Sequence, residues 1–234
     1  MLDIRQLSVA FWGIKAIDDL SATLDAPVVG LIGPNGAGKT TLVNLLSGLV
    51  PAASGQVLLD GQALLPLSPR QRVRHGLRRS FQTEQVVEDL SVWNNLRAML
   101  DHVPHERASA NAELATALEF TGLSELATRL GSELNLFQRR MVEIAKALLG
   151  QPRLLLFDEP GAGLTEQEAR HLRRAICAIP EHFGAQVLLI DHDVDLIQAT
   201  CTQTLVLDFG KRLALGPTAQ VLQDPAVRRA YLGA

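Results

Sequence analysis

The chain has 234 residues, of which 47% are hydrophobic and 4% aromatic, and its formal net charge is −3. This size suits one large domain with a substantial core, and the apolar content excludes an intrinsically disordered chain. The slight negative charge and the few aromatic residues argue against a protein that binds nucleic acid through its phosphates or by stacking on its bases.

The two cysteines, Cys177 and Cys201, do not form a C-x-x-C pair. A disulfide and two reduced thiols both fit the sequence, and a reduced cytosolic protein is the simpler interpretation. Asp3 and Arg5 interrupt the N-terminal segment, so we expect no signal peptide. The charge-free stretch 40–59 has the length of a membrane span, but its Pro, Gly, Ser and Asn residues predict a helix, a turn and a strand. Any crossing of a membrane would then be made by another subunit.

Alternating apolar residues in the first 25 positions predict two strands joined through Trp12 and Gly13. The apolar run Val28–Ile32 predicts a buried strand, and residues 41–46 predict the helix that follows it. Residues 56–59 predict another short strand, with Asp60-Gly61 as its turn. A short helix is expected to begin at Ser68-Pro69 and to end near Gly76.

The segment Gly33-Pro34-Asn35-Gly36-Ala37-Gly38-Lys39-Thr40 fits the phosphate-binding P-loop pattern G-x-x-x-x-G-K-[ST] between that strand and that helix. Its glycines allow backbone N–H groups to approach a phosphate, and the helix N-terminus favours an anion. Lys39 can neutralise the outer phosphates, and the Thr40 hydroxyl can ligate Mg²⁺. We assign nucleotide binding to Gly33, Asn35, Gly36, Ala37, Gly38, Lys39, Thr40 and Thr41.

Five arginines lie in and just after the short helix, at positions 70, 72, 74, 78 and 79. They fit an anion-binding patch or a solvated face. Because no aromatic residues are interleaved, we predict the solvated face.

The pattern from residue 91 to 150 is helical throughout, with Gly122 separating two helices. Beyond it, predicted strands alternate with predicted helices: strands at 154–157, 187–190 and 204–207, and helices at 166–179 and 194–199. Strands separated by helices predict a parallel sheet covered on both faces. We therefore predict an α/β protein with a P-loop NTPase core of parallel sheet flanked by helices, an N-terminal antiparallel β part and a helical insert.

Polar residues that suit phosphate chemistry follow two of these strands. Asp158 and Glu159 end the strand 154–157, at the edge of the sheet where the P-loop also lies. Asp158 can hold Mg²⁺ through water, and Glu159 can polarise the water that attacks the γ-phosphate. His192, just past the strand 187–190, can hydrogen-bond that phosphate, and Gln82 can reach the metal or the attacking water. Alternatively, Asp158 and Glu159 could be solvated carboxylates and His192 a histidine without a functional role. The presence of the P-loop favours the functional interpretation.

The order of these motifs over essentially the whole chain resembles the nucleotide-binding subunit of an ABC transporter. The P-loop, Gln82, Asp158-Glu159 and His192 match that family's Walker A motif, Q-loop, Walker B motif with catalytic glutamate, and switch histidine. The resemblance implies ATP and Mg²⁺ as cofactors, with Glu159, His192 and Gln82 catalytic and Thr40, Gln82 and Asp158 at the metal. It also implies that Phe11 stacks on adenine. Residues 8–20, 157–165 and 215–233 are similar to the branched-chain amino acid and urea uptake branch.

The same resemblance implies a single ABC ATPase domain over residues 1–234. Residues 1–82 and 151–234 would form a RecA-like core with its antiparallel part, and 83–150 a helical subdomain. The implied partners are a second ATPase subunit, transmembrane permease subunits and, indirectly, a solute-binding protein, but no nucleic acid. The expected location is peripheral, on the cytoplasmic face of the inner or plasma membrane, through the membrane subunits.

One motif departs from the family. Its signature, Leu-Ser-Gly-Gly-Gln, is here Leu134-Asn135-Leu136-Phe137-Gln138. Asn135 can still offer a side-chain donor at a helix N-terminus. The side chains of Leu136 and Phe137 would crowd a site built for glycine, or pack in a dimer interface. Thr165 also replaces the family's D-loop aspartate.

Three functions compete. The intact Glu159 and His192 favour an ATPase motor for solute import, whereas the altered 134–138 stretch favours a nucleotide-binding regulatory partner with weak hydrolysis. A P-loop kinase ranks last, because it does not explain Glu159 and His192. A homodimer would place the altered signature over both nucleotides, and a heterodimer over only one, so we expect a heterodimer. The transported solute is not encoded in this chain.

Overall fold

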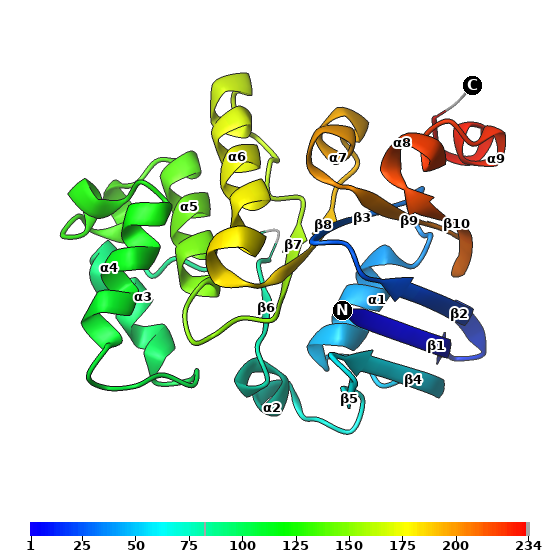
Figure 1. Cartoon of the computed structure of the whole chain (residues 1–234), viewed down its shortest axis with the longest axis horizontal. Helices are drawn as coiled ribbons and strands as arrows, with labels where there is room; N and C mark the ends of the chain where they lie inside the picture. The colour runs from blue at the N-terminus through cyan, green and yellow to red at the C-terminus, as the bar shows by residue number, and fades with distance from the viewer. Residues whose placement is uncertain (82, 233–234) are drawn as a thin grey trace. The chain divides into compact units, whose positions relative to one another are not determined.

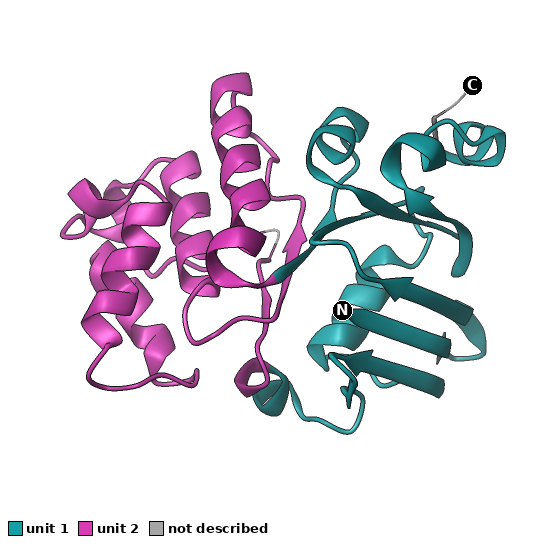
Figure 2. Ribbon diagram, in the orientation of Figure 1, with its two compact units in different colours: residues 1–72, 186–234 teal, residues 73–185 magenta. Residues whose placement is uncertain are grey.

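The structure of the chain, a computed structural model, describes residues 1–81 and 83–232 (Figure 1). The chain divides into two compact units (Figure 2). Unit 1 comprises residues 1–72 and 186–234, and unit 2 comprises residues 73–185. The first and last parts of the sequence thus fold together, and the middle of the chain forms the second unit.

Unit 1 begins with an antiparallel sheet in the strand order β2-β1-β4-β5. Its strands are β1 (Leu2–Phe11), β2 (Ile14–Leu24), β4 (Ser54–Leu59) and β5 (Gln62–Ala63). Trp12 and Gly13 join β1 to β2 with φ angles of 47° and 86°. Two left-handed residues in a row are typical of the tight hairpin turn whose twist matches that of the strands. The predicted hairpin is therefore confirmed.

The second set of strands in unit 1 is mixed, in the order β10-β9-β3-β8. Strand β3 (Val28–Ile32) runs parallel to both β8 (Gln186–Ile190) and β9 (Gln203–Asp208), whereas β10 (Lys211–Pro217) pairs antiparallel with β9. Every residue of β3 and β8 is buried, and this burial explains why the sequence of each strand is a nearly continuous apolar run. The helical elements of this unit are α1 (Lys39–Ser47), α7 (Val194–Thr200), α8 (Thr218–Val221), α9 (Pro225–Val227) and the single turn η3 (Arg228–Leu232).

Unit 2 contains the parallel pair β6 (Leu77–Arg79) and β7 (Leu154–Asp158), preceded in the chain by α2 (Pro69–Arg74). Its helices are α3 (Val92–Leu100), α4 (Ala110–Phe120), α5 (Leu136–Ala147) and α6 (Glu166–Phe183), with short 3₁₀ turns at Ser124–Leu126 and Gly131–Glu133. Helix α6 continues past Pro180 and ends at Gly184, whose φ is 65° and whose N–H donates to the Pro180 carbonyl at 3.0 Å.

The predicted fold class is confirmed: parallel strands flanked by helices, with an antiparallel sheet at the N-terminus. The residues of β5, β6 and β10 were not predicted as strands, because these segments are short or carry charged residues at the edge of a sheet. The helical subdomain expected over 83–150 lies within unit 2, and its bounds stay a prediction. None of the described helices combines the length and the apolar character that crossing a bilayer requires. Both cysteines carry thiols.

The prediction of a solvated arginine face was wrong for three of the five side chains. Arg72 and Arg78 are 4% and 3% exposed, and the Arg79 side chain is 10% exposed. Arg78 donates to the carbonyls of Val73, Leu77, Leu149 and Gly150, and burial lowers its pKa to about 10. A guanidinium has five N–H donors in a rigid plane, so it can hydrogen-bond several backbone carbonyls that have no other partner. A sequence pattern does not reveal this role.

Arg72 performs the same task in unit 1. Its guanidinium donates to the carbonyls of Leu45 and Leu46 in the last turn of α1, and also to those of Leu65 and Leu67. The last carbonyls of a helix have no partner within it, and a cation there also complements the helix dipole. Arg72 therefore caps the end of α1 opposite to the P-loop.

We predict that Arg72→Met lowers the free energy of unfolding by about 2–3 kcal/mol, because it leaves buried carbonyls without donors. Thermal unfolding should show a melting temperature lower by roughly 4–12 °C. Arg74→Met is the matched control, since Arg74 lies on the same helix but is exposed, and it should change stability by less than about 0.5 kcal/mol. Equal shifts for the two variants would contradict the capping role.

Candidate functional site

The P-loop connects β3 to α1 in a conformation that only glycine adopts readily. Gly33, Gly36 and Gly38 have φ angles of 151°, 79° and 103°. A Cβ on Gly33 would collide with the Leu207 carbonyl oxygen, and one on Gly38 would lie 2.6 Å from the Ala16 carbonyl oxygen. The glycines of the motif thus meet both a dihedral and a steric requirement.

A turn that the sequence did not single out holds this loop in place. Gly210, between β9 and β10, donates its N–H to the Ala37 carbonyl at 3.0 Å and accepts the Asp18 N–H at 2.9 Å. Its own Cβ would lie 2.7 Å from the Ala16 carbonyl oxygen, so the turn also requires glycine. The P-loop is therefore fixed through backbone contacts to β2 and to the β9–β10 turn.

Lys39 extends across the P-loop. Its ammonium donates to the carbonyls of Gly33 at 2.6 Å and Pro34 at 3.0 Å. Among the described residues of α1, no side chain caps the N-terminus and none in the first turn is acidic. Asn35, Gly36 and Thr40 are exposed. A cation beside an uncapped helix N-terminus is an arrangement that attracts a phosphate group.

The predicted switch histidine follows the strand next to the P-loop strand. β3 and β8 are parallel neighbours, with Leu31 paired to Ile190, so their carboxyl ends lie at the same edge of unit 1. The His192 side chain is 71% exposed, and its Nδ1 lies 3.7 Å from Oδ1 of Asp191, which is 5% exposed. The structure therefore brings His192 and the P-loop to one edge.

Phe11, the residue expected to stack on adenine, is the last residue of β1 and pairs with Ile14 across the hairpin. Its side chain is partly accessible, since the residue is 39% exposed. This exposure suits a stacking platform, and the role stays a prediction.

Two of the predicted site residues, Asp158 for the metal and Glu159 for the attacking water, lie in unit 2. Asp158, at the end of β7, is 3% exposed, and its Oδ2 lies 3.5 Å from the Arg79 guanidinium. Burial lowers the pKa of Arg79, and the charge of Asp158 opposes that shift. Glu159 follows with a φ of 50°, a conformation that costs energy for a residue other than glycine. Asp60, Gln151 and Phe209 share this conformation, so it does not distinguish Glu159 from them, and the role of Glu159 stays a prediction.

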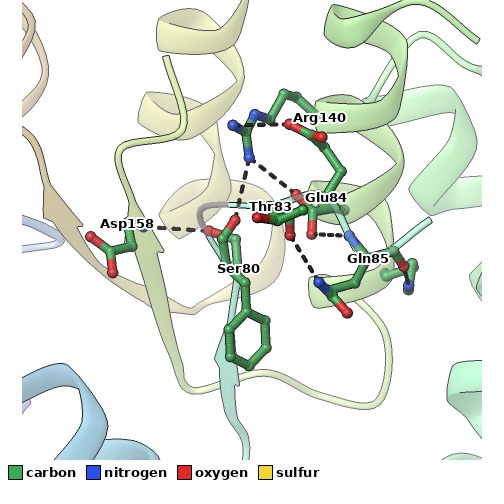
Figure 3. A network of polar contacts seen from close by, with 9 residues as sticks. Ser80, Thr83, Glu84, Gln85, Arg140 and Asp158 are labelled. Carbon is green, nitrogen blue, oxygen red and sulfur yellow. Dashed lines mark hydrogen bonds and ion pairs between the residues drawn. The ribbon is translucent and has the colours of Figure 1, made fainter. Parts of the chain in front are cut away.

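Gln82 lies outside the described residues, but residues on both sides of it belong to a polar network that includes the buried Arg140 (Figure 3). Arg140 of α5, whose side chain is 6% exposed, lies 3.0 Å from the Glu84 carboxylate and donates to the Phe81 carbonyl at 3.3 Å. Ser80 Oγ accepts the backbone N–H of Asp158 at 3.4 Å.

Two further residues of α5 hold the same segment. Glu143 accepts the Gln85 N–H at 3.0 Å, and Lys146 donates to the Gln85 carbonyl at 2.5 Å. Burial raises the pKa of Glu143 and lowers that of Lys146. The backbone on both sides of position 82 is therefore anchored within unit 2.

The altered signature stretch begins α5 with a complete capping box. Asn135 Oδ1 accepts the Gln138 N–H at 2.8 Å, and Gln138 Oε1 accepts the Asn135 N–H at 3.0 Å. The cap uses the amide oxygen of Asn135, and the donor role expected of its amide NH₂ group stays a prediction. Leu136 is 38% exposed, and the Phe137 ring lies edge-to-face with His171 at 5.4 Å.

Family models match two parts of the chain. The model described as "ABC transporter" matches residues 17–162, more than half of the chain. The chain belongs to the ABC transporter family. A second model, described as "Branched-chain amino acid ATP-binding cassette transporter", matches residues 211–234. The first match covers the P-loop, Asp158 and Glu159, and the second covers β10 and the C-terminal helices.

Curated relatives match over nearly their whole length. The high-affinity branched-chain amino acid transport ATP-binding protein LivG of Escherichia coli K12 is 35% identical, over 100% of this chain and 98% of its own. BraF of Pseudomonas aeruginosa, with the same description, is 32% identical over the same shares. The lipopolysaccharide export system ATP-binding protein LptB of Escherichia coli K12 is 34% identical, over 99% of this chain and 97% of its own.

Solved structures agree with the fold. The ADP conformation of MJ1267, an ATP-binding cassette of an ABC transporter, has a TM-score of 0.89 and 27% identity, covering 100% of this chain and 99% of its own. The cassette MJ0796, solved as a dimer bound to ADP and phosphate, has a TM-score of 0.78 at 18% identity, covering 93% of this chain and 99% of its own. The latter likeness concerns the fold alone.

We predict that Lys39→Ala weakens binding of a labelled ATP analogue by about 10- to 100-fold, because a charge-assisted hydrogen bond to phosphate is lost. Equilibrium titration measures this. Arg107→Ala, which removes an exposed cation from a loop of unit 2, should leave the affinity unchanged. An unaltered affinity for the ATP analogue in the Lys39 variant would contradict the assignment of the P-loop as the nucleotide-binding site.

Proposed function

We propose that the chain is the ATP-hydrolysing motor subunit of an ABC importer for branched-chain amino acids, urea or a related small polar solute. The observation that carries this proposal is the P-loop at the start of α1, with the Lys39 ammonium across it and His192 after the neighbouring parallel strand. Family membership and the intact Glu159 support hydrolysis rather than binding alone.

The choice of solute class depends on the C-terminal segment. Identity over the whole chain does not decide it, because LptB, a lipopolysaccharide export protein, matches nearly as well as LivG. Residues 211–234 match the model described for branched-chain amino acid transporters, and the relatives LivG and BraF are described by that transport. These matches favour import of a small polar solute.

In the proposed mechanism, the backbone N–H groups of the P-loop bind the phosphates and Lys39 neutralises their outer charge. The glycine positions fit a bound phosphate. A Cβ on Gly36 would meet no neighbour within 4 Å, so this side of the loop is open, whereas Gly33 and Gly38 pack against the backbone of neighbouring segments. Phe11 stacks on the adenine. His192 hydrogen-bonds the γ-phosphate.

Thr40 and, through water, Asp158 would hold Mg²⁺, together with Gln82. Within the described part of the chain, no cluster of three or more His, Cys, Asp or Glu residues could hold a metal by itself. That suits Mg²⁺, which proteins commonly bind through one or two side chains together with substrate phosphates and water. The ion would neutralise charge on the phosphates. Glu159 accepts a proton from the attacking water as general base.

The proposed motor function also implies partner subunits and a location in the cell. ABC ATPase domains dimerise and work with transmembrane permeases, and we propose a second, different ATPase subunit, permease subunits and, indirectly, a solute-binding protein. The chain would lie peripherally on the cytoplasmic face of the membrane. Closure of the ATPase dimer on ATP and its reopening after hydrolysis would move the permeases.

A second candidate function is a regulatory partner with weak hydrolysis. The observation that favours it is the occupation of two glycine positions of the signature by Leu136, which is 38% exposed, and Phe137. Leu136 also packs against Gly163 in the loop after β7, where a Cβ would lie 3.0 Å from the leucine side chain. Glu159 and His192 distinguish the candidates, because a purely regulatory subunit does not need them.

We predict that Glu159→Gln leaves ATP binding intact but lowers the turnover of the assembled transporter by about 10²-fold or more, because the amide cannot accept the proton of the attacking water. ATP hydrolysis and analogue binding are measured on the same preparation. Glu166→Gln is the control, since the Glu166 side chain is 85% exposed, and it should hydrolyse ATP normally. Normal turnover with Glu159→Gln would assign the role to another residue or to the partner's site.

We also predict that the dimer is asymmetric. Purified alone with ATP, the chain should be mostly monomeric and nearly inactive. Mixed with its partner ATPase, it should form a complex whose activity depends on Glu159 more than on the partner's equivalent glutamate. Light scattering and hydrolysis assays on single-site variants measure both properties.

The triple variant Asn135→Ser, Leu136→Gly, Phe137→Gly completes this test. In a heterodimer it should raise turnover, because it restores the signature over the partner's nucleotide. A stable, fully active homodimer whose turnover the triple variant leaves unchanged would refute the asymmetry.

A further inference from the structure

Arg79 places a positive charge beside the predicted metal ligand Asp158. The Arg79 side chain is 10% exposed and that of Asp158 5%, and Nη2 of the arginine lies 3.5 Å from Oδ2 of the aspartate. A carboxylate buried to this extent needs a compensating charge, because it has lost the hydration that stabilises it in water. Arg79 supplies such a charge from within unit 2.

The backbone holds the two residues next to each other. Strands β6 and β7 are parallel neighbours with Arg79 paired to Leu156, and the Ser80 N–H donates to the Leu156 carbonyl at 2.9 Å. At the end of β7, Ser80 Oγ accepts the Asp158 N–H at 3.4 Å (Figure 3). The ends of both strands are therefore held together, and the placement of one charge beside the other does not depend on the ion pair alone.

A second contact holds the Arg79 guanidinium independently of Asp158. Its central carbon lies over the Phe81 ring, 4.8 Å from the ring centroid, and the Phe81 carbonyl accepts a hydrogen bond from Arg140 at 3.3 Å. A planar guanidinium can place its face on an aromatic ring while its edge donates to a carboxylate. Arg79 can therefore stay in place when the Asp158 carboxylate engages another cation.

The length of the ion pair suits a carboxylate that has a second task. Strong charge-assisted N–H···O bonds are about 2.7–2.9 Å long, and the contact between Arg79 and Asp158 is longer, at 3.5 Å. The arginine thus compensates the charge of Asp158 more through space than through a strong hydrogen bond. A cation that binds at Asp158 would meet both the attraction of the carboxylate and the repulsion of the arginine.

We infer that Arg79 is a positioning residue that acts through Asp158 and sets how strongly nucleotide binding depends on Mg²⁺. While the ion is absent, the charge of Arg79 offsets the repulsion between Asp158 and the phosphates of ATP. When the ion binds, the same charge repels it. Both effects reduce the gain in affinity for ATP that Mg²⁺ provides. The inference rests on the proposed place of Asp158 at the Mg²⁺ that accompanies ATP.

The test measures the affinity of the full chain for a labelled, non-hydrolysable ATP analogue, once with excess Mg²⁺ and once with EDTA. The ratio of the two affinities gives the coupling between the ion and the nucleotide. Arg79→Gln, which removes the charge and keeps a hydrogen-bond donor, should raise this ratio by about tenfold. Arg79→Lys, which keeps the charge, should leave the ratio close to that of the unaltered chain.

Arg129→Gln is the matched control for loss of an arginine. Arg129 also pairs with a carboxylate, that of Glu133 at 3.7 Å, but its side chain is 60% exposed. This variant should leave the ratio unchanged.

Direct measurement of metal binding gives a second readout. With Mn²⁺ in place of Mg²⁺ and the analogue at saturation, electron paramagnetic resonance measures the free Mn²⁺ that remains. Arg79→Gln should bind Mn²⁺ more tightly than the unaltered chain, because the ion no longer meets the charge of the arginine.

Asp158→Asn separates a failure of the inference from a failure of the proposed metal site. If Mg²⁺ improves binding to Asp158→Asn as much as to the unaltered chain, the proposed role of Asp158 is refuted, and the inference with it. If Asp158→Asn reduces the effect of Mg²⁺ but Arg79→Gln leaves the ratio unchanged, the ion pair is only structural and the inference alone fails. A raised ratio in Arg79→Lys would show that the charge is not the cause, and this variant decides even if Arg79→Gln does not fold.

Discussion

The contact on which unit 1 depends is a close approach of backbone to backbone. The P-loop, β2 and the β9–β10 turn meet through Gly33, Gly38 and Gly210, where any Cβ would collide with a carbonyl oxygen. Because no side chains separate these segments, hydrogen bonds between main-chain groups hold the loop. The start of α1 is thereby fixed without a side-chain cap, and its N–H groups remain directed at the place where a phosphate would bind. Arg72 stabilises the other end of the same helix.

In unit 2, the buried charges of Arg140 and Glu143 have the corresponding role, together with the half-buried Lys146 of the same helix. Arg140 contacts the Phe81 carbonyl and the Glu84 carboxylate (Figure 3), and Glu143 and Lys146 hold the backbone of Gln85. Buried ion pairs contribute little net stability, because the cost of desolvating both charges offsets their attraction. They do restrict geometry, since each charge needs its particular partner. The helix that begins at the altered signature thus also fixes the neighbours of a predicted catalytic residue.

The altered signature stretch, residues 134–138, keeps the residues that start the helix but not those that the family uses at the nucleotide. Asn135 and Gln138 form a complete capping box at the start of α5. Leu136 and Phe137, where the family pattern has glycines, are therefore compatible with the helix, and their side chains bear on what its N-terminus can approach. We expect the side chain of Leu136, which is 38% exposed, to hinder a phosphate there, whereas the fold of unit 2 accommodates it.

The sequence by itself determined the P-loop, the buried strands β3, β7 and β8, the Trp12-Gly13 turn and the carboxylates at the end of β7, because dihedral limits, apolar runs and strand ends are local properties. It misjudged Arg72, Arg78 and Arg79, because decisive partners of each lie in segments distant in the chain: the carbonyls of Leu45 and Leu46 for Arg72, those of Leu149 and Gly150 for Arg78, and the Asp158 carboxylate for Arg79. The same holds for the backbone hydrogen bond between Gly210 and Ala37. Only the tertiary structure decided these contacts, since each joins groups whose spacing along the sequence carries no pattern.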